Sequence, residues 1–196
     1  MSEDGAAERA AAGRAPAVQP ADAGSAEGGA GVELVRLDSG APGVAALRES
    51  VLRIPLLPGQ HRFVKPAAHT LPRADDDPNR TPFAVVVRGA AVGFGILDRG
   101  GSLAELTSAP RSAVLLRAFY IAPEWQGHGV GRAACAALDP LILADAPGAA
   151  EVLLTVNEAN PAAIRAYLAS GFVDTGRRYL DGDAGPQLIL SRPVRR

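Results

Sequence analysis

The chain has 196 residues, of which 47% are hydrophobic and 21% are charged, and its formal net charge at pH 7 is −1. A near-neutral chain without a basic stripe is not expected to bind nucleic acid, and no apolar run approaches the roughly 18 residues that a membrane-spanning helix needs. The single cysteine excludes an internal disulfide, and the three histidines lack metal-ligand spacing, so no metal site is expected.

The beginning of the chain differs in composition from the rest. Residues 1–31 are rich in alanine, glycine and charge, and they have too few large apolar side chains to offset the entropy of ordering by burial. We expect a disordered tail over residues 1–31 and one folded domain over residues 32–196. The acidic start also lacks the basic and apolar regions of a signal peptide, so a cytoplasmic location is the default expectation.

The expected folded domain begins with alternating apolar residues. This pattern predicts a strand over residues 32–37, and Pro42 then starts a helix. Residues 55–82 contain several prolines and an acidic run, which favour loops with room for one short helix. Residues 83–97 predict a hairpin that turns at Arg88-Gly89.

Further strands are expected over residues 114–121, 151–156, 172–177 and 187–190. Helices between these strands imply a mixed sheet with at least one parallel crossover.

Residues 115–132 read LLRAFYIAPEWQGHGVGR, an apolar run that passes into a glycine-spaced turn and then a helix. Gly127, Gly129 and Gly131 leave no Cβ between the backbone N–H groups and a ligand that approaches closely. The positive end of the following helix and the side chain of Arg132 favour an anion there. The stretch therefore predicts a turn that binds a pyrophosphate. Pro140 should kink or end the helix near Asp139.

Two other phosphate-binding motifs compete with this interpretation. A P-loop is excluded because no Gly-Lys-Ser or Gly-Lys-Thr follows the glycines. Gly129, Gly131 and Ala134 match the dinucleotide fingerprint G-x-G-x-x-A, but that fingerprint normally opens a fold, and here most of the chain precedes it. A dinucleotide-binding protein is kept as an alternative.

A second informative stretch lies between residues 157 and 172. Asn160 is a good N-cap, Pro161 suits the first helical position, and Gly171 suits a left-handed stop, so a helix is expected over residues 161–170. Tyr167 shares the apolar stripe of that helix. By spacing alone, Tyr167 is typical of a core tyrosine.

These two stretches together resemble a known family. Residues 126–131, QGHGVG, resemble the Q/R-x-x-G-x-G/A motif of the GNAT superfamily of acetyl-coenzyme A-dependent N-acetyltransferases. Residues 157–172, NEANPAAIRAYLASGF, resemble the later motif of the family, and the spacing between the motifs also fits. The resemblance implies an α/β (α+β) fold with a mixed, mostly antiparallel twisted sheet of six to seven strands flanked by about four helices.

The resemblance also implies the site residues and acetyl-CoA as the co-substrate. The backbone of Phe119, Tyr120 and Ile121 would pair with the pantetheine arm. The other expected cofactor-binding residues are Gln126, Gly127, His128, Gly129, Val130, Gly131, Arg132, Asn157, Asn160 and Tyr167. In many members the tyrosine at the position of Tyr167 protonates the departing thiolate, so Tyr167 is the expected catalytic acid.

The acceptor amine must lose a proton, because an amine with a pKa of about 10.4 is almost fully protonated near neutral pH. Four acidic residues near predicted strand ends, Glu105, Glu124, Glu158 and Asp98, are candidates to take that proton, and Glu105 is the preferred one. A direct attack of the amine on acetyl-CoA is expected.

The acceptor itself is less well defined by the sequence. Residues 60–64, QHRFV, and residues 180–183, LDGD, resemble bacterial diamine and polyamine acetyltransferases, although the usual Asp-Gly-Glu is here Asp-Gly-Asp. We therefore expect a small-molecule amine acceptor, a small amine or polyamine, and leave a peptide N-terminus or an antibiotic open. Asp75, Asp76 and Asp77 either attract a polycation or form a solvated loop.

A function of another class is also compatible with the sequence. A non-catalytic coenzyme A-binding module that senses acyl-CoA would need the glycine turn but no base. The retained Tyr167 disfavours such a module, whereas the lack of an obvious base favours it. The sequence leaves a homodimer open, and Cys135 among alanines is expected to be a small buried filler rather than a nucleophile.

Overall fold

The computed structural model describes residues 31–196. The tail predicted over residues 1–31 therefore lies outside the described residues, apart from Gly31. Within residues 31–196, none of the helices combines the length and the apolar character needed to cross a membrane.

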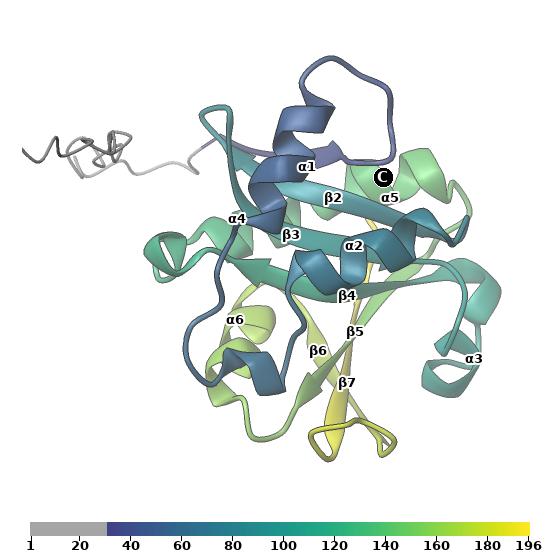
Figure 1. Ribbon diagram of the computed structural model, residues 1–196. Helices are drawn as coiled ribbons and strands as arrows, with labels where there is room; N and C mark the ends of the chain where they lie inside the picture. The colour runs from purple at the N-terminus through teal and green to yellow at the C-terminus, as the bar shows by residue number, and fades with distance from the viewer. Residues whose placement is uncertain (1–30) are drawn as a thin grey trace, which may run out of the picture.

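A seven-stranded sheet with strand order β1-β2-β3-β4-β5-β7-β6 runs through the described part of the chain (Figure 1). The strands are β1 (Val32–Arg36), β2 (Arg80–Val87), β3 (Ala90–Asp98), β4 (Ala113–Ile121), β5 (Glu151–Asn157), β6 (Val173–Tyr179) and β7 (Gln187–Pro193). All neighbours pair antiparallel except β4 and β5, which are parallel. The predicted mixed, mostly antiparallel sheet with a parallel crossover is confirmed.

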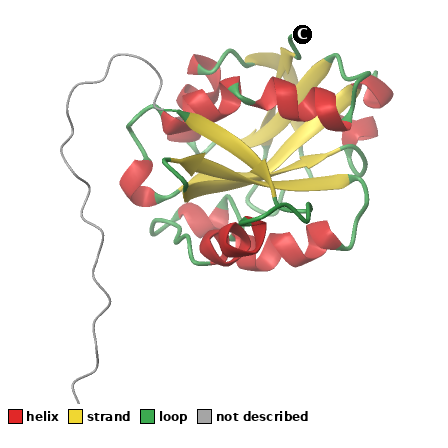
Figure 2. Ribbon diagram, turned by 90° about the horizontal axis from the view of Figure 1, so that it is seen from above, coloured by secondary structure: helices red, strands yellow, loops and turns green. Residues whose placement is uncertain are grey.

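Helices cover both faces of this sheet (Figure 2). They are α1 (Val44–Leu52), α2 (Ala67–Asp75), α3 (Leu103–Leu106), α4 (Val130–Ala136), α5 (Leu138–Asp145) and α6 (Pro161–Ala169), with 3-10 turns η1 (Gln60–Arg62), η2 (Pro110–Ser112) and η3 (Pro123–Trp125). Apolar side chains of α1 and α2 pack in one core cluster with Phe94 and Tyr120, and those of α4 and α5 pack in another with Phe83 and Leu116. The sheet therefore separates two apolar cores.

The described part of the chain has more helices than the four or so expected. The helix after the glycine turn is divided at Ala137 into α4 and α5. Pro140 lies in the first turn of α5, where its missing N–H has no helical partner to lose. The previous helix thus ends at Ala136, and the proline lies within the first turn of a new helix that begins at Leu138.

The loops expected over residues 55–82 contain the nine-residue helix α2 and the first residues of β2. Ala67, Leu71 and Ala74 are buried at helical spacing in the same core cluster as Ala84 of β2, and this packing offsets the unfavourable Pro72 in the helix. Pro82 lies inside β2, where its carbonyl accepts a hydrogen bond from Leu37 N at 2.8 Å. Its missing N–H faces the end of β1, so no pairing of that strand is lost.

The parallel pair β4 and β5 separates soon after it begins. Pairing joins residues 113–115 to residues 151–153. Beyond this point β5 stays paired with β7 as far as Asn157, whereas β4 is bent by a bulge opposite Gly95, where Ala118 has a φ of 50°. A bulge increases local twist, so β4 turns away from β5. The two strands diverge at this point in Figure 1.

Candidate active site

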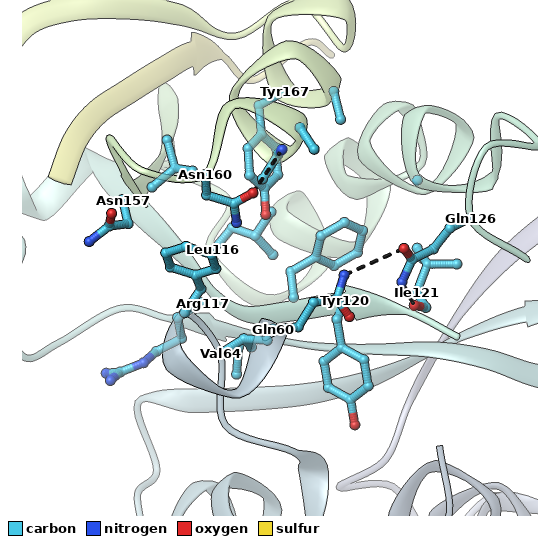
Figure 3. A pocket seen from close by; sticks show the side chains of 18 of the residues that line it. Gln60, Val64, Leu116, Arg117, Tyr120, Ile121, Gln126, Asn157, Asn160 and Tyr167 are labelled. Atoms are coloured by element: carbon cyan, nitrogen blue, oxygen red, sulfur yellow. Dashed lines mark hydrogen bonds between the residues drawn. The ribbon is translucent and has the colours of Figure 1, made fainter. Parts of the chain in front are cut away.

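A cavity of about 650 Å³ lies where β4 and β5 separate. Its walls include residues 116–121 of β4 and residues 155–157 of β5. The other walls come from residues 60–65, the glycine turn, α6 and the loop between β6 and β7. In Figure 3, Tyr167 and the pair Gln60 and Val64 approach the cavity from opposite sides of β4. The cavity is therefore accessible to groups from both faces of the sheet.

The glycine turn is held by Gln126. Its Nε2 donates to the carbonyl oxygen of Ile121 at 2.8 Å, and its Oε1 accepts from Gln60 Nε2 at 3.4 Å. Gly127 and Gly129 have φ values of 80° and 77°, in the left-handed region that favours glycine. A Cβ at either position would meet no atom within 4 Å, so the backbone conformation and not crowding within the chain requires glycine.

Most of the predicted turn residues line the cavity. They are Gln126, Gly127, Gly129, Gly131 and Arg132. The other two do not. His128 is exposed, and Val130, the first residue of α4, is buried in the core. Val130 therefore anchors the first turn of the helix by packing.

Tyr167 lies on α6 with its ring beside two other aromatic rings. The ring centroids lie 6.4 Å from Phe119 and 5.8 Å from Phe172, the latter in an edge-on contact. Burial, together with the nearby Cys135, raises the pKa of the Tyr167 hydroxyl. The hydroxyl is thus protonated at any physiological pH and is able to donate a proton into the cavity that it lines.

Gly95 permits this aromatic arrangement. A Cβ at Gly95 would lie 2.4 Å from the Phe83 ring and 3.1 Å from the Phe119 ring. Since Phe119 packs against Tyr167, a side chain at Gly95 would displace the support of Tyr167.

The two predicted asparagines both line the cavity but differ in their hydrogen bonds. Asn160 caps α6, because its Oδ1 accepts from Ala163 N at 3.2 Å, which confirms the predicted cap. Asn157 is buried, and its Nδ2 donates to the carbonyl oxygen of Ala184 at 2.8 Å. Its Oδ1 accepts from Ala159 N at 2.8 Å. Asn157 therefore ties the end of β5 to the loop between β6 and β7.

Phe119, Tyr120 and Ile121 all line the cavity. The Tyr120 hydroxyl also accepts from Ala67 N at 3.0 Å, so its side chain anchors the start of α2. Pairing of this β4 backbone with a bound pantetheine arm stays a prediction.

The structure does not bring the predicted bases to the cavity. Glu105 is exposed on α3, away from α6 in Figure 1, and Glu124 and Glu158 are exposed outside the cavity wall. Asp98 is buried and accepts from Arg80 Nε at 3.1 Å and Arg117 Nη1 at 2.8 Å. Burial opposes its ionisation, yet the Arg117 and Gly100 donors hold the pKa of Asp98 below its usual value. Asp98 is therefore an ionic anchor.

Asp183 is the carboxylate that lines the cavity in the described part of the chain. It lies in the loop between β6 and β7, close to Ala184, which Asn157 binds. Sequence reasoning did not propose Asp183 as a base. The departure from the Asp-Gly-Glu pattern at residues 181–183 was the signal that pointed to this loop.

The acidic run at residues 75–77 lies elsewhere. Asp75 pairs with Arg48, and Asp77 pairs with Arg80 at 3.2 Å. Asp75 and Asp77 line a second hollow of about 530 Å³ beside α2. Their charges are used within the protein, so they do not form a polycation site in the main cavity.

Cys135 is buried on α4 and forms part of the cavity wall, and burial raises the pKa of its thiol to about 11. The predicted burial of Cys135 is confirmed, and a neutral thiol is a poor nucleophile, which favours the filler role. Over residues 31–196 no group of three or more His, Cys, Asp or Glu side chains is arranged to hold a metal ion.

Comparisons with known proteins identify the class to which this site belongs. The family model of the acetyltransferase (GNAT) family matches residues 48–172, so the chain belongs to the GNAT family. An uncharacterized N-acetyltransferase, YbbJ of Bacillus subtilis (strain 168), is 32% identical over 130 residues, which cover 66% of this chain and 80% of YbbJ.

Solved structures support the same fold. The aminoglycoside acetyltransferase AAC(6')-Ib in complex with coenzyme A aligns with a TM-score of 0.59 and 19% identity over 83% of this chain and 93% of that chain. The GNAT domain of S. lividans PAT aligns with a TM-score of 0.57 and 21% identity over 83% and 89%. A spermidine N-acetyltransferase from Vibrio cholerae in complex with coenzyme A and spermine aligns with a TM-score of 0.54 and 18% identity over 83% and 95%.

The protein is accordingly an acetyl-CoA-dependent N-acetyltransferase, with acetyl-CoA as its co-substrate. Family membership sets aside the dinucleotide interpretation of the glycines. The expected fold, enzyme class and co-substrate are confirmed, whereas the roles of individual site residues stay predictions.

Proposed function

We propose that the enzyme transfers acetyl from acetyl-CoA to the primary amine of a small molecule by direct attack. The observation that carries this proposal is the place of Tyr167 in the wall of a cavity between β4 and β5 that is lined from both sides of β4. Two substrates that enter from opposite faces would meet at Tyr167, without a covalent acetyl-enzyme between them. The buried, protonated Cys135 also argues against such an intermediate.

The glycine turn suits the pyrophosphate of acetyl-CoA. Backbone N–H groups near Gly127 and Gly129, together with the start of α4, can donate to phosphate oxygens. The part of β4 that has separated from β5 leaves backbone groups for the pantetheine amides. An arm extended along residues 117–121 would carry the thioester to Tyr167.

The proposed reaction needs two proton transfers. The neutral amine attacks the thioester carbonyl, a C–N bond forms, and the C–S bond then breaks to release coenzyme A as a thiolate. Tyr167 gives its proton to the sulfur, and the nitrogen loses a proton to reach the amide product. A thiol with a pKa of about 8.5 is already a fair leaving group, so the help from Tyr167 is moderate.

We propose Asp183 as the group that takes the amine proton, directly or through water. Its place in the cavity wall and its support by Asn157 through the Ala184 carbonyl favour this role over Glu105, which lies outside that wall. The assignment is independent of the Tyr167 role, because the two residues act on different protons.

The test is acetyl-CoA-dependent release of free thiol across a panel of polyamines, small amines and peptide N-termini. Release with one class of amine, strongly reduced in Tyr167→Phe but not in the matched control Tyr179→Phe, would support the proposal. Tyr179 packs against a third apolar cluster, which includes Leu103 and Leu106 of α3, and it lies outside the cavity wall. An unchanged rate in Tyr167→Phe would remove Tyr167 from the mechanism.

A further inference from the structure

Outside the glycine turn, the charged and imidazole side chains that line the cavity are mostly basic. They are His61, Arg62, Lys65, Arg117 and Asp183. His61, Arg62 and Lys65 come from the single segment between α1 and α2, which lies on the other side of β4 from Tyr167 in Figure 3. We call residues 60–65 the basic segment.

The basic side chains differ in whether their charge is used within the protein. Arg117 donates to buried Asp98 at 2.8 Å, so its charge is compensated. Arg62 and Lys65 take part in none of the ion pairs formed within residues 31–196. The Arg62 guanidinium lies 4.3 Å from the centroid of the Phe63 ring, a contact that limits its freedom. The basic segment therefore brings two uncompensated cations to the cavity, in addition to Arg132 beside the glycine turn, which is also absent from these ion pairs.

We infer that the acceptor is a small primary amine that also carries an anionic group, a carboxylate or a phosphate, which Arg62 and Lys65 bind. This inference rests on the proposed amine acetylation and adds the chemical class of the amine. A planar guanidinium and an ammonium on one segment suit an oxyanion, since both donate charge-assisted hydrogen bonds.

The same charges disfavour a polyamine. A polycation beside Arg62 and Lys65 would meet like charges, and one carboxylate, Asp183, would have to compensate for them. The acidic run at residues 75–77 offers no help, because Asp75 and Asp77 are paired with arginines at the second hollow.

The basic segment would also position the acceptor for the chemistry. The anionic group binds to the basic segment, while the amine reaches Asp183 and the thioester.

A competing role for the basic segment is binding of the coenzyme A phosphates. Gln60 contacts Gln126 at the start of the glycine turn, so the segment approaches the turn at this one end. Phosphate donors are already present in the turn itself, and Arg62 and Lys65 follow further along the segment. Coenzyme A affinity therefore separates the two roles.

The experiment compares matched amines that differ in charge. β-Alanine is paired with propylamine, phosphoethanolamine with ethanolamine, and spermidine serves as the polycation. We expect kcat/KM to favour the anionic member of at least one pair by about tenfold or more, and the favoured pair distinguishes carboxylate from phosphate. The preference should fall as salt is raised from 0.05 to 0.5 M in the assay, because exposed charges are screened.

Variants test the assignment to the basic segment. Arg62→Gln and Lys65→Gln should each raise KM for the anionic amine by roughly fivefold to tenfold and narrow its preference over the neutral partner. Arg73→Gln removes one exposed positive charge from α2 outside the cavity and is the matched control. The dissociation constant of coenzyme A should be the same in all four proteins.

Three outcomes would overturn the inference. Equal or better turnover of the neutral amine in both pairs, or turnover of spermidine that matches both anionic amines, would do so while leaving amine acetylation intact. A loss of coenzyme A affinity in Arg62→Gln would assign the segment to the cofactor. If no amine is acetylated, the proposed function is wrong. The inference about the anionic group is then tested separately, by calorimetric binding of N-acetyl-β-alanine and N-propylacetamide to the coenzyme A complex. Equal binding of the two would overturn it, whereas an Arg62-dependent preference for the anion would support it.

Discussion

The two walls of the cavity use different parts of the polypeptide. The glycine turn presents backbone N–H groups, whose directions follow from the left-handed conformations of Gly127 and Gly129. The basic segment presents the side chains of Arg62 and Lys65, which can change without any change of fold. This difference shows how one fold can keep a common acetyl donor while the acceptor varies, because backbone geometry is shared and side chains are not.

The largest expected effect concerns Tyr167, which lies between the two walls. Tyr167→Phe should lower kcat about a hundredfold, since loss of a general acid commonly costs this much. The affinity for acetyl-CoA should change little, because the aromatic contacts with Phe119 and Phe172 are retained. Steady-state kinetics and a coenzyme A titration measure both.

The pH dependence of kcat tests the same proposed role of Tyr167 as the general acid. Since burial raises the pKa of Tyr167 above its ordinary value of 10.0, kcat should show no loss from Tyr167 ionisation up to about pH 10. A decline near pH 8 that disappears in Tyr167→Phe would contradict the proposed environment of the hydroxyl.

Asp98 forms an ion pair with Arg117, which lines the cavity. Asp98→Asn therefore tests whether the stability of the fold beside the cavity depends on this buried charge. The variant should lower the free energy of unfolding by about 2 kcal/mol at pH 7, at the low end for a buried pair because Arg117 is partly exposed. Urea unfolding measures the change, with exposed Asp181→Asn as the control.

The pH dependence of this difference has a defined sign. The pKa of Asp98 is lower in the folded protein, so its stabilisation is complete above the unfolded value of about 3.8 and is lost as the pH falls through the folded value. The difference between wild type and Asp98→Asn should therefore shrink only under strongly acidic conditions. If the difference in unfolding free energy between wild type and Asp98→Asn shrinks between pH 8 and pH 6, ionisation of Asp98 is not its cause.

Gly129→Ala tests the backbone conformation of the glycine turn alone. A Cβ has space there, but a φ of 77° costs a non-glycine residue about 1–2 kcal/mol, so the turn should relax and lose affinity for coenzyme A by roughly tenfold. Gly148→Ala, at an exposed glycine with open space and ordinary φ, is the matched control. Equal coenzyme A affinity in Gly129→Ala and Gly148→Ala would show that the left-handed turn is dispensable for coenzyme A binding.

The smallest expected effect is that of Asn157→Ala. Loss of its hydrogen bond to the Ala184 carbonyl should loosen the loop that carries Asp183 and raise the acceptor KM by about fivefold, equivalent to one net hydrogen bond. The affinity for coenzyme A should be retained. A selective loss of coenzyme A affinity would instead favour the direct cofactor contact predicted for Asn157 from the family motif.

Local features of the site were predictable because the signals lie close together in the chain. The turn around Gly127 and Gly129 and the cap of α6 by Asn160 each depend on a few consecutive residues. The predicted interruption of the helix near Pro140 is confirmed, but the new helix α5 that contains this proline depends on packing of Leu138 and Ile142 in the core. For the same reason α2 was not expected at its full length.

The choice of catalytic base shows where local reasoning stops. Glu105 follows a predicted strand, which is a common place for a functional carboxylate, yet α3 carries it outside the cavity wall. Asp183 reaches that wall because β7 pairs along β5 and brings the loop between β6 and β7 back to Asn157. No local sequence pattern near Asp183 predicts the pairing of β7 with β5.

The sequence by itself determined the glycine turn and the cap of α6, since glycine conformations and helix caps are decided by neighbouring residues. The tertiary structure alone decided which side chains share the cavity with them. Separation of β4 from β5 opens the cavity, and the basic segment and Asp183 meet there from opposite parts of the chain. Long-range strand pairing and packing set these positions, and neither is encoded in a short stretch of residues.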